Sequence, residues 1–197
     1  MTPVGSRLQL KLDDEVRRMA NEWFFKWHYI GRDGPVEIDS FRGKPIVYGG
    51  IKFSGSAHIV YWETIQYYLR KKISTTFDEL ETEIKPYPVE IRREAMHESE
   101  RLVQTFASRI RRMAIEKDRI LRGDGMNFPA EHDFGKWSGA GPGDIKVRAD
   151  SLLRIYGETV REQTSFWQKA NAVWDEHRWW IGGLGFAIGL VGLLSIF

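Results

Sequence analysis

Two short stretches of the sequence combine histidine with carboxylates, the side chains that bind metal ions and transfer protons. Glu94 and His97 have the Glu-x-x-His spacing of carboxylate-bridged di-iron bundles, but that centre needs a second such pair and two further glutamates, and the sequence holds a single pair. Residues 131–133 read Glu-His-Asp, and three adjacent side chains cannot all face one ion easily. We therefore predict no metal site and no cofactor.

A serine and a glycine-rich stretch each lack the surroundings that catalysis or phosphate binding needs. Ser56 precedes His58 by two residues without a nucleophile-elbow pattern or an orienting acid, so we expect this pair at the junction of a hairpin and a helix. Residues 139–143 read Gly-Ala-Gly-Pro-Gly, which lacks the Gly-Lys-Ser/Thr ending and the preceding strand of a phosphate loop. The absence of cysteine excludes thiolate catalysis. The sequence thus predicts no catalytic residue and no enzyme.

The charge balance narrows the class of partner. The 29 Lys and Arg residues nearly cancel the 27 Asp and Glu residues, which argues against a nucleic-acid-binding protein, because such proteins gain affinity by neutralising phosphates. With 42% hydrophobic residues the chain can bury a core.

The last 19 residues, Trp179 to Phe197, contain no charge and a single hydroxyl, that of Ser195. As a helix this stretch would be roughly 28 Å long, close to the hydrocarbon thickness of a bilayer. Trp179 and Trp180 stand where an interfacial aromatic belt belongs, and Arg178 lies just outside it. We predict a single membrane span that anchors the chain at its C-terminal end. A buried core helix or a re-entrant segment is the alternative, since the strictly apolar part begins only at Ile181.

Glycines are regularly spaced within the predicted span. At about 100° per residue they fall on one arc of about 80° of a helix, which would let a second helix approach closely. We call them the glycine stripe: Gly182, Gly185, Gly189 and Gly192. We predict that this stripe packs against another helix, either of a second copy or of a different protein. The alternative is that glycine is simply frequent in membrane helices.

Hydrophobic periodicity predicts four helices before the span. Residues 13–27 form an amphipathic helix with acidic residues in its first turn. Residues 58–84 form a second helix that ends at the Pro-Tyr-Pro triplet 86–88, and its apolar residues share one face: Ile59, Trp62, Ile65, Leu69, Ile73, Phe77 and Leu80. A longer helix covers residues 89–122 and ends at Gly123. The last helix begins near Asp144 and shows no break signal before the span. Between the last two helices, residues 123–143 are expected to form a long glycine-rich loop.

The segment before residue 58 contains the predicted β-structure. Residues 46–48 and 51–53 read as two short strands joined by a turn at Gly49 and Gly50. Since an isolated hairpin is marginally stable, we expect it to pack on another element.

Two groups of side chains are candidates for contact with a partner or with lipid. Trp23 and Phe24 make the first helix unusually apolar; burial in the core is their default position, and a partner or the membrane surface is the alternative. The second group is a basic cluster near the end of the long helix, where a solvated face is the alternative to contact with acidic partners or anionic lipid. Its members are Arg109, Arg111, Arg112, Arg119 and Arg122.

Together these patterns predict a mainly α, extended helical protein with a small β-hairpin and one C-terminal transmembrane helix. The predicted segments are residues 1–57, residues 58–143 and residues 144–197, the last continuing into the span. We expect a non-catalytic, single-pass accessory subunit of a multisubunit membrane complex, with a self-oligomerising membrane effector or pore former as the alternative. Its partners would be other membrane-protein subunits, the lipid bilayer and anionic lipid, in a bacterial inner membrane or an organellar (mitochondrial) inner membrane.

Overall fold

The computed structural model describes residues 1–30, 34–49, 56–123 and 139–155, and 78% of these residues are helical. The chain divides into two compact units, Met1–Leu153 and Arg154–Phe197, and the first contains nearly all of the described residues. A mainly helical fold with a small two-stranded antiparallel sheet is thereby confirmed. No helix in the described ranges combines the length and apolarity that a membrane crossing requires. The predicted span at 179–197 lies outside the described residues.

The first helix begins ten residues earlier than its hydrophobic period indicated. α1 spans Pro3–Arg18, and the Thr2 side chain caps it by accepting a hydrogen bond from the Gly5 N–H at 3.0 Å. Pro3 suits the first helical position because its missing N–H would have no helical partner there. A π-helical turn, η1 (Met19–Phe24), and a short α2 (Phe25–Trp27) continue the same helix. The predicted start at Asp13 was therefore wrong, and the acidic residues 13–15 lie in the C-terminal half of α1.

The aromatic residues of η1 and α2 form the centre of the core. Trp23 and Phe24 are 3% and 4% exposed, and Trp27 is fully buried. The Tyr61 ring lies 5.5 Å from that of Trp23 and 4.9 Å from that of Trp27, between ring centroids. The alternative of a surface role for Trp23 and Phe24 was therefore wrong, because α3 covers both side chains within the chain itself. Phe25, which points away, is exposed.

The small sheet pairs different residues from those predicted. β1 (Pro35–Ile38) and β2 (Ile46–Gly49) are antiparallel, with Val36 opposite Tyr48 and Ile38 opposite Ile46. These alternate positions share one face, and Ile38 and Tyr48 are buried, with the Tyr48 ring 5.6 Å from that of Trp27. The predicted strand at 46–48 is confirmed, but it pairs with the segment before it. The predicted partner, residues 51–53, lies outside the described residues.

Two long helices follow, and their bounds agree closely with the sequence. α3 spans Ser56–Ile84 and α4 spans Val89–Arg122, separated by the predicted Pro-Tyr-Pro turn. The predicted apolar face of α3 is buried at Trp62, Ile65, Leu69, Ile73, Phe77 and Leu80. Ile59 was expected on this face but is 55% exposed. Ala57 and Tyr61 take the core positions of the first turns, and Ile59, two residues from each, points the other way.

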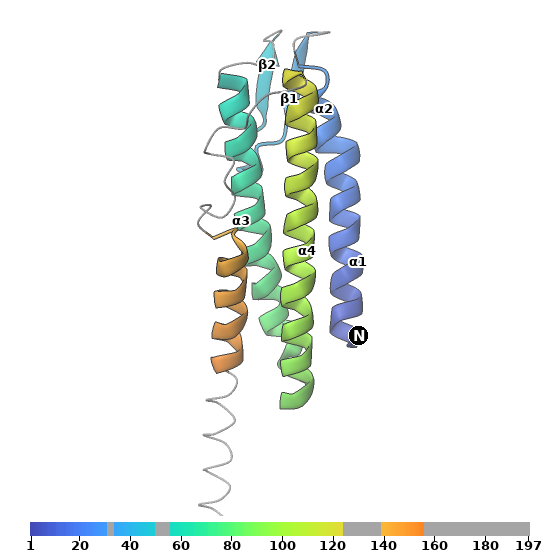
Figure 1. Ribbon diagram of the computed structural model, residues 1–197, viewed down its shortest axis with the longest axis vertical. Coiled ribbons are helices and arrows are strands. Elements are labelled where there is room, and N and C mark those ends of the chain that lie inside the picture. The colour runs from blue at the N-terminus through green and yellow to red at the C-terminus, as the bar shows by residue number, and fades with distance from the viewer. Residues whose placement is uncertain (31–33, 50–55, 124–138, 156–197) are drawn as a thin grey trace, which may run out of the picture. The chain divides into compact units, whose positions relative to one another are not determined.

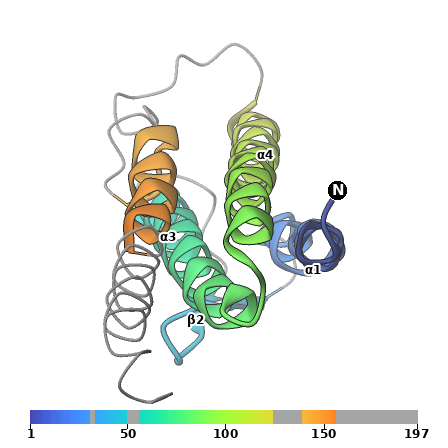
Figure 2. The same ribbon diagram turned by 90° about the horizontal axis from the view of Figure 1, so that it is seen from below.

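The long helices of the first unit lie side by side. α1 packs along α4, and α3 contacts both: it packs on α4 and is joined to α1 by the Arg7–Glu83 ion pair and the Tyr68–Glu15 hydrogen bond (Figures 1 and 2). A further helix, residues 142–155, runs beside α3 and buries Ile145, Ala149 and Leu152. It begins two residues before the predicted start at Asp144. Pro142 is its first residue, and the Asp144 carboxylate accepts a hydrogen bond from the Gly141 N–H at 3.0 Å.

Candidate functional site

A charged groove opens between α1, α3 and the loop that connects the two strands. Its volume is about 410 Å³, within the range of small-ligand sites. We call it the basic groove, and its lining residues are Glu15, Arg18, Asp39, Phe41, Gly43, Tyr68, Lys71, Lys72 and Thr75. α1 supplies the first two residues, the loop the next three and α3 the last four. Three cations thus face two carboxylates, which leaves an excess of positive charge.

Glu15 is the hub of the polar contacts in this groove. Its Oε1 accepts hydrogen bonds from the Tyr68 hydroxyl at 2.7 Å and from Arg18 Nη2 at 2.6 Å, and Lys72 Nζ lies 3.8 Å from its Oε2. Burial opposes ionisation of Glu15, but the bonds from Arg18 and Tyr68 and the charge of Lys72 outweigh it and lower the pKa of this carboxyl. Burial, together with the Glu15 carboxylate, raises the pKa of Tyr68 far above its ordinary value. Tyr68 therefore remains a donor.

The Glu15 network makes a specific contribution to acid stability. The folded pKa of Glu15 is below its ordinary value of 4.5, so the stabilisation is fully present above about pH 4.5 and is lost as pH falls through the folded pKa. We expect Glu15→Gln to flatten part of the fall in unfolding free energy below pH 4.5, measured by urea denaturation at a series of pH values. Glu63→Gln, which changes an exposed glutamate of α3, serves as the control and should leave the slope unchanged. Equal slopes for wild type and Glu15→Gln would contradict this prediction.

Phe41, in the groove wall, has an unusual backbone conformation. Its φ is +56°, in the left-handed region that non-glycine residues rarely adopt. The Phe41 N–H donates to Asp39 Oδ1 at 2.7 Å, and Lys71 Nζ donates to the Phe41 carbonyl at 3.1 Å. The ring packs 4.6 Å from that of Tyr68, between centroids. Such a conformation costs on the order of 1–3 kcal/mol and persists only where surrounding contacts enforce it.

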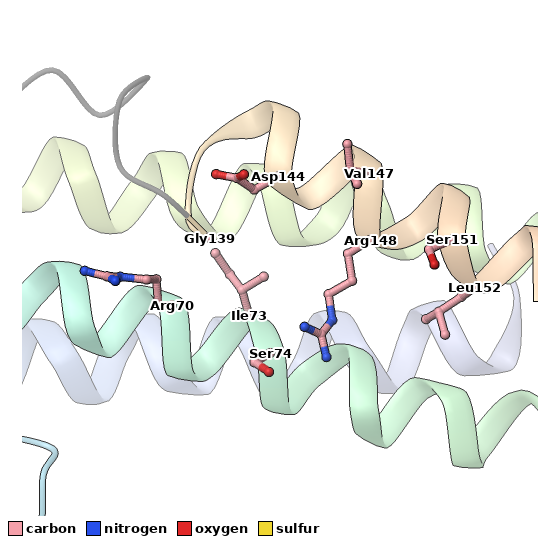
Figure 3. Close-up of a pocket in the computed structure, with 9 residues that line it drawn as sticks. All are labelled: Arg70, Ile73, Ser74, Gly139, Asp144, Val147, Arg148, Ser151 and Leu152. Atoms are coloured by element: carbon pink, nitrogen blue, oxygen red, sulfur yellow. The ribbon is translucent and has the colours of Figure 1, made fainter.

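A second, larger cavity of about 660 Å³ lies between α3 and the helix at residues 142–155 (Figure 3). Its polar groups are engaged in holding the fold together. Arg148 pairs with Asp78 of α3, and Asp144 accepts from the Gly141 N–H. The remaining cation, Arg70, points along α3 away from Arg148, and its stem packs against Gly139. Because the guanidinium groups of Arg70 and Arg148 point apart, they cannot bind one charged ligand together in this cavity.

A buried cluster joins the end of α4 to the start of α3. Asp118 has a 1% exposed side chain, and its carboxylate accepts from Arg122 Nε at 3.0 Å and from Trp62 Nε1 at 3.2 Å. His58 Nε2 lies 3.4 Å from Asp118 Oδ1. His58 is thus part of a structural ion-pair cluster at the beginning of α3, near where the sequence placed a helix junction.

The structure separates the members of the predicted basic cluster. Arg109 pairs with Asp13 of α1, and Arg122 pairs with Asp118. Arg111 is 8% exposed and donates to the Ala140 carbonyl, so its predicted contact with a partner or lipid was wrong. Burial lowers the pKa of Arg111. Arg112 and Arg119 are exposed. One row of arginines in the sequence therefore points in several directions, because neighbouring residues on a helix face different sides.

The other predicted site residues fall into two groups. The glycine stripe (Gly182, Gly185, Gly189 and Gly192) and the interface residues Arg178, Trp179 and Trp180 lie outside the described residues, as do residues 131–133. Glu94 and His97 are exposed on α4. Within the described ranges, no three His, Asp or Glu side chains gather in a way that could hold a metal ion.

Sequence reasoning missed the basic groove entirely. Tyr67 and Tyr68 precede Lys71 and Lys72 by four residues, so each aromatic side chain shares a helix face with a lysine, and this spacing was an available signal. The sequence contained no signal for the contribution of Phe41, because no local pattern predicts that a phenylalanine adopts a positive φ. Comparison of the chain with protein-family models, curated proteins and solved structures finds no match.

Proposed function

We propose that this chain is a non-catalytic, membrane-anchored accessory subunit of a multisubunit membrane complex. The observation that carries the proposal is the uncharged stretch Trp179–Phe197, flanked by Arg178 and opened by two tryptophans. In this proposal residues 179–197 span the bilayer once, and the helical unit Met1–Leu153 binds neighbouring subunits. The membrane would be a bacterial inner membrane or a mitochondrial inner membrane, including those that contain energy-transducing complexes.

Two features of the helical unit bear on the subunit contacts that the proposal requires. Its charged side chains tie helices to one another: Arg7 pairs with Glu83, Arg109 with Asp13 and Arg148 with Asp78. Exposed apolar side chains remain on several elements of this unit, among them Leu10, Val47, Ile120 and Val147. Single exposed apolar residues are ordinary on protein surfaces, and these positions are compatible with subunit contacts.

The membrane anchor is tested by removing it. We expect a chain truncated after Arg178 to move from the membrane pellet to the supernatant after alkaline carbonate extraction, because the apolar stretch supplies the attachment. The full-length chain should stay in the pellet. As a matched control, Gly182→Leu in the full-length chain should also stay there, since leucine is at least as apolar as glycine. A truncated chain that remains in the pellet would place the anchor elsewhere and contradict the proposal.

The glycine stripe favours a second candidate, a self-oligomerising effector or pore former. The two candidates differ in what the pure protein does. An accessory subunit should co-purify with several different proteins at a fixed ratio after gentle detergent extraction, and should leave dye-loaded liposomes intact. Dye release by the pure protein that is abolished by Gly185→Leu with Gly189→Leu would support the effector and exclude the subunit.

A further inference from the structure

We propose that the basic groove binds a small phosphate monoester that carries a planar apolar group. The phosphate would lie among Arg18, Lys71 and Lys72, and the planar group would lie against the ring of Phe41. This inference concerns the described helical unit alone and is independent of how the chain attaches to a membrane.

The basic groove carries positive charge that its own carboxylates leave uncompensated. Arg18 directs Nε and Nη2 to the two oxygens of Glu15, at 3.3 and 2.6 Å. Lys72 Nζ is 3.8 Å from Glu15, beyond hydrogen-bond distance. An ammonium group has three N–H donors, and Lys71 uses one of them on the Phe41 carbonyl. Donors of both lysines therefore stay available to an oxyanion, and a compact ammonium group suits phosphate.

An apolar wall of aromatic rings lies beside these cations. Phe41 and Tyr68 have ring centroids 4.6 Å apart, and the Trp23 ring lies 5.9 Å from that of Phe41. A phosphate alone would leave the wall unused, whereas a phosphate on a planar group would contact both parts of the groove.

The backbone around the groove adopts conformations that cost free energy. The positive φ of Phe41 is unfavourable, and two hydrogen bonds, one from the cation Lys71, maintain it. A π-helical turn, a feature frequent at functional sites, begins at Met19 directly after Arg18. Two uncommon backbone conformations thus flank one groove. The second cavity, whose cations do not converge, has no comparable arrangement.

The binding test uses phenyl phosphate, inorganic phosphate and phenol, each titrated into the full-length chain by calorimetry. We expect phenyl phosphate to bind at least tenfold more tightly than phosphate, and phenol to give no measurable heat. Dioctanoyl phosphatidic acid, a soluble lipid with the same phosphate monoester but no planar group, is the comparison: if it binds more tightly than phenyl phosphate, the groove recognises a lipid headgroup and the planar-group proposal is overturned. Failure of phenyl phosphate to bind, or binding no tighter than that of inorganic phosphate, would likewise overturn the proposal.

Variants of the groove test its contacts with the phosphate and with the planar group separately. Lys71→Met with Lys72→Met should lower the affinity for phenyl phosphate at least tenfold. The control, Lys26→Met with Lys146→Met, removes two exposed lysines elsewhere and should leave this affinity unchanged. Phe41→Asn removes the ring and keeps a residue that tolerates positive φ, so it should reduce phenyl phosphate to the affinity of inorganic phosphate. Urea unfolding reports whether each variant is folded. Equal binding by folded wild type and the folded Lys71/Lys72 variant would show that the lysines only hold the loop, and would overturn the proposal.

Discussion

Asp118→Ala should lower the free energy of unfolding by about 3 kcal/mol, because it removes the acceptor at the centre of a buried cluster. Asp118 is 1% exposed at its side chain and holds Arg122, Trp62 and His58 around one carboxylate. Without it, the Arg122 guanidinium, whose side chain is 18% exposed, loses its ion pair where water replaces it poorly. Urea denaturation followed by circular dichroism measures the loss.

The control for Asp118→Ala lies two residues away on the same helix. Glu116 is exposed on α4, so Glu116→Ala should change the free energy of unfolding by less than about 0.5 kcal/mol. It reports any effect of alanine on α4 itself. If Asp118→Ala lowers the free energy of unfolding by less than about 1 kcal/mol, water solvates the partners of Asp118 well, and the prediction is contradicted.

Gly5→Ala should destabilise the fold by about 2 kcal/mol, although alanine is the better helix former. Glu98 of α4 directs its carboxylate at the start of α1, where Oε2 accepts from both the Thr2 N–H and the Thr2 hydroxyl at 2.8 Å. A Cβ on Gly5 would overlap this carboxylate. Burial opposes ionisation of Glu98, but the two bonds from Thr2 outweigh it and lower the pKa of this carboxyl. The methyl group would therefore displace an ionised, hydrogen-bonded side chain.

Two controls test whether the effect of Gly5→Ala arises from the overlap with Glu98. Gly143 also lies in the first turn of a helix, but a Cβ there would meet nothing within 4 Å, so Gly143→Ala should be neutral or slightly stabilising. In a Glu98→Ala background the clash is gone, and Gly5→Ala should cost little further. Thermal unfolding of the four Gly5 and Glu98 combinations measures this coupling. Additive losses would show that Gly5 acts through something other than Glu98.

The sequence predicted most accurately those elements whose signals are local. α4 has the predicted bounds because Pro88 and Gly123 stop the helix on either side of an uninterrupted period. The start of α1 was placed too late, although its signals are local as well. Val4, Leu8 and Leu12 continue the four-residue spacing of Val16 toward the N-terminus and are buried, and Thr2 and Pro3 mark the helix start.

What the sequence could not predict depends on contacts between distant residues. The strand at 46–48 could pair with the segment before or after it, and burial of Ile38 against the aromatic core favours the earlier one. Burial of Trp23 and Phe24 was the default expectation, but only the placement of α3 over them excludes the alternative of contact with a partner or the membrane surface. The basic groove combines residues from α1, a loop and α3, so no stretch of sequence contains it.

The π-helical turn at Met19–Phe24 has a consequence for how this chain could vary in length. Each hydrogen bond of a π-helix closes over one residue more than in an α-helix, so the segment holds a residue that α geometry would not need. A chain one residue shorter here could close the turn as ordinary α-helix and leave α1 and the sheet intact. Within the helix from Pro3 to Trp27, the turn is therefore the point where the deletion of one residue would be absorbed most easily.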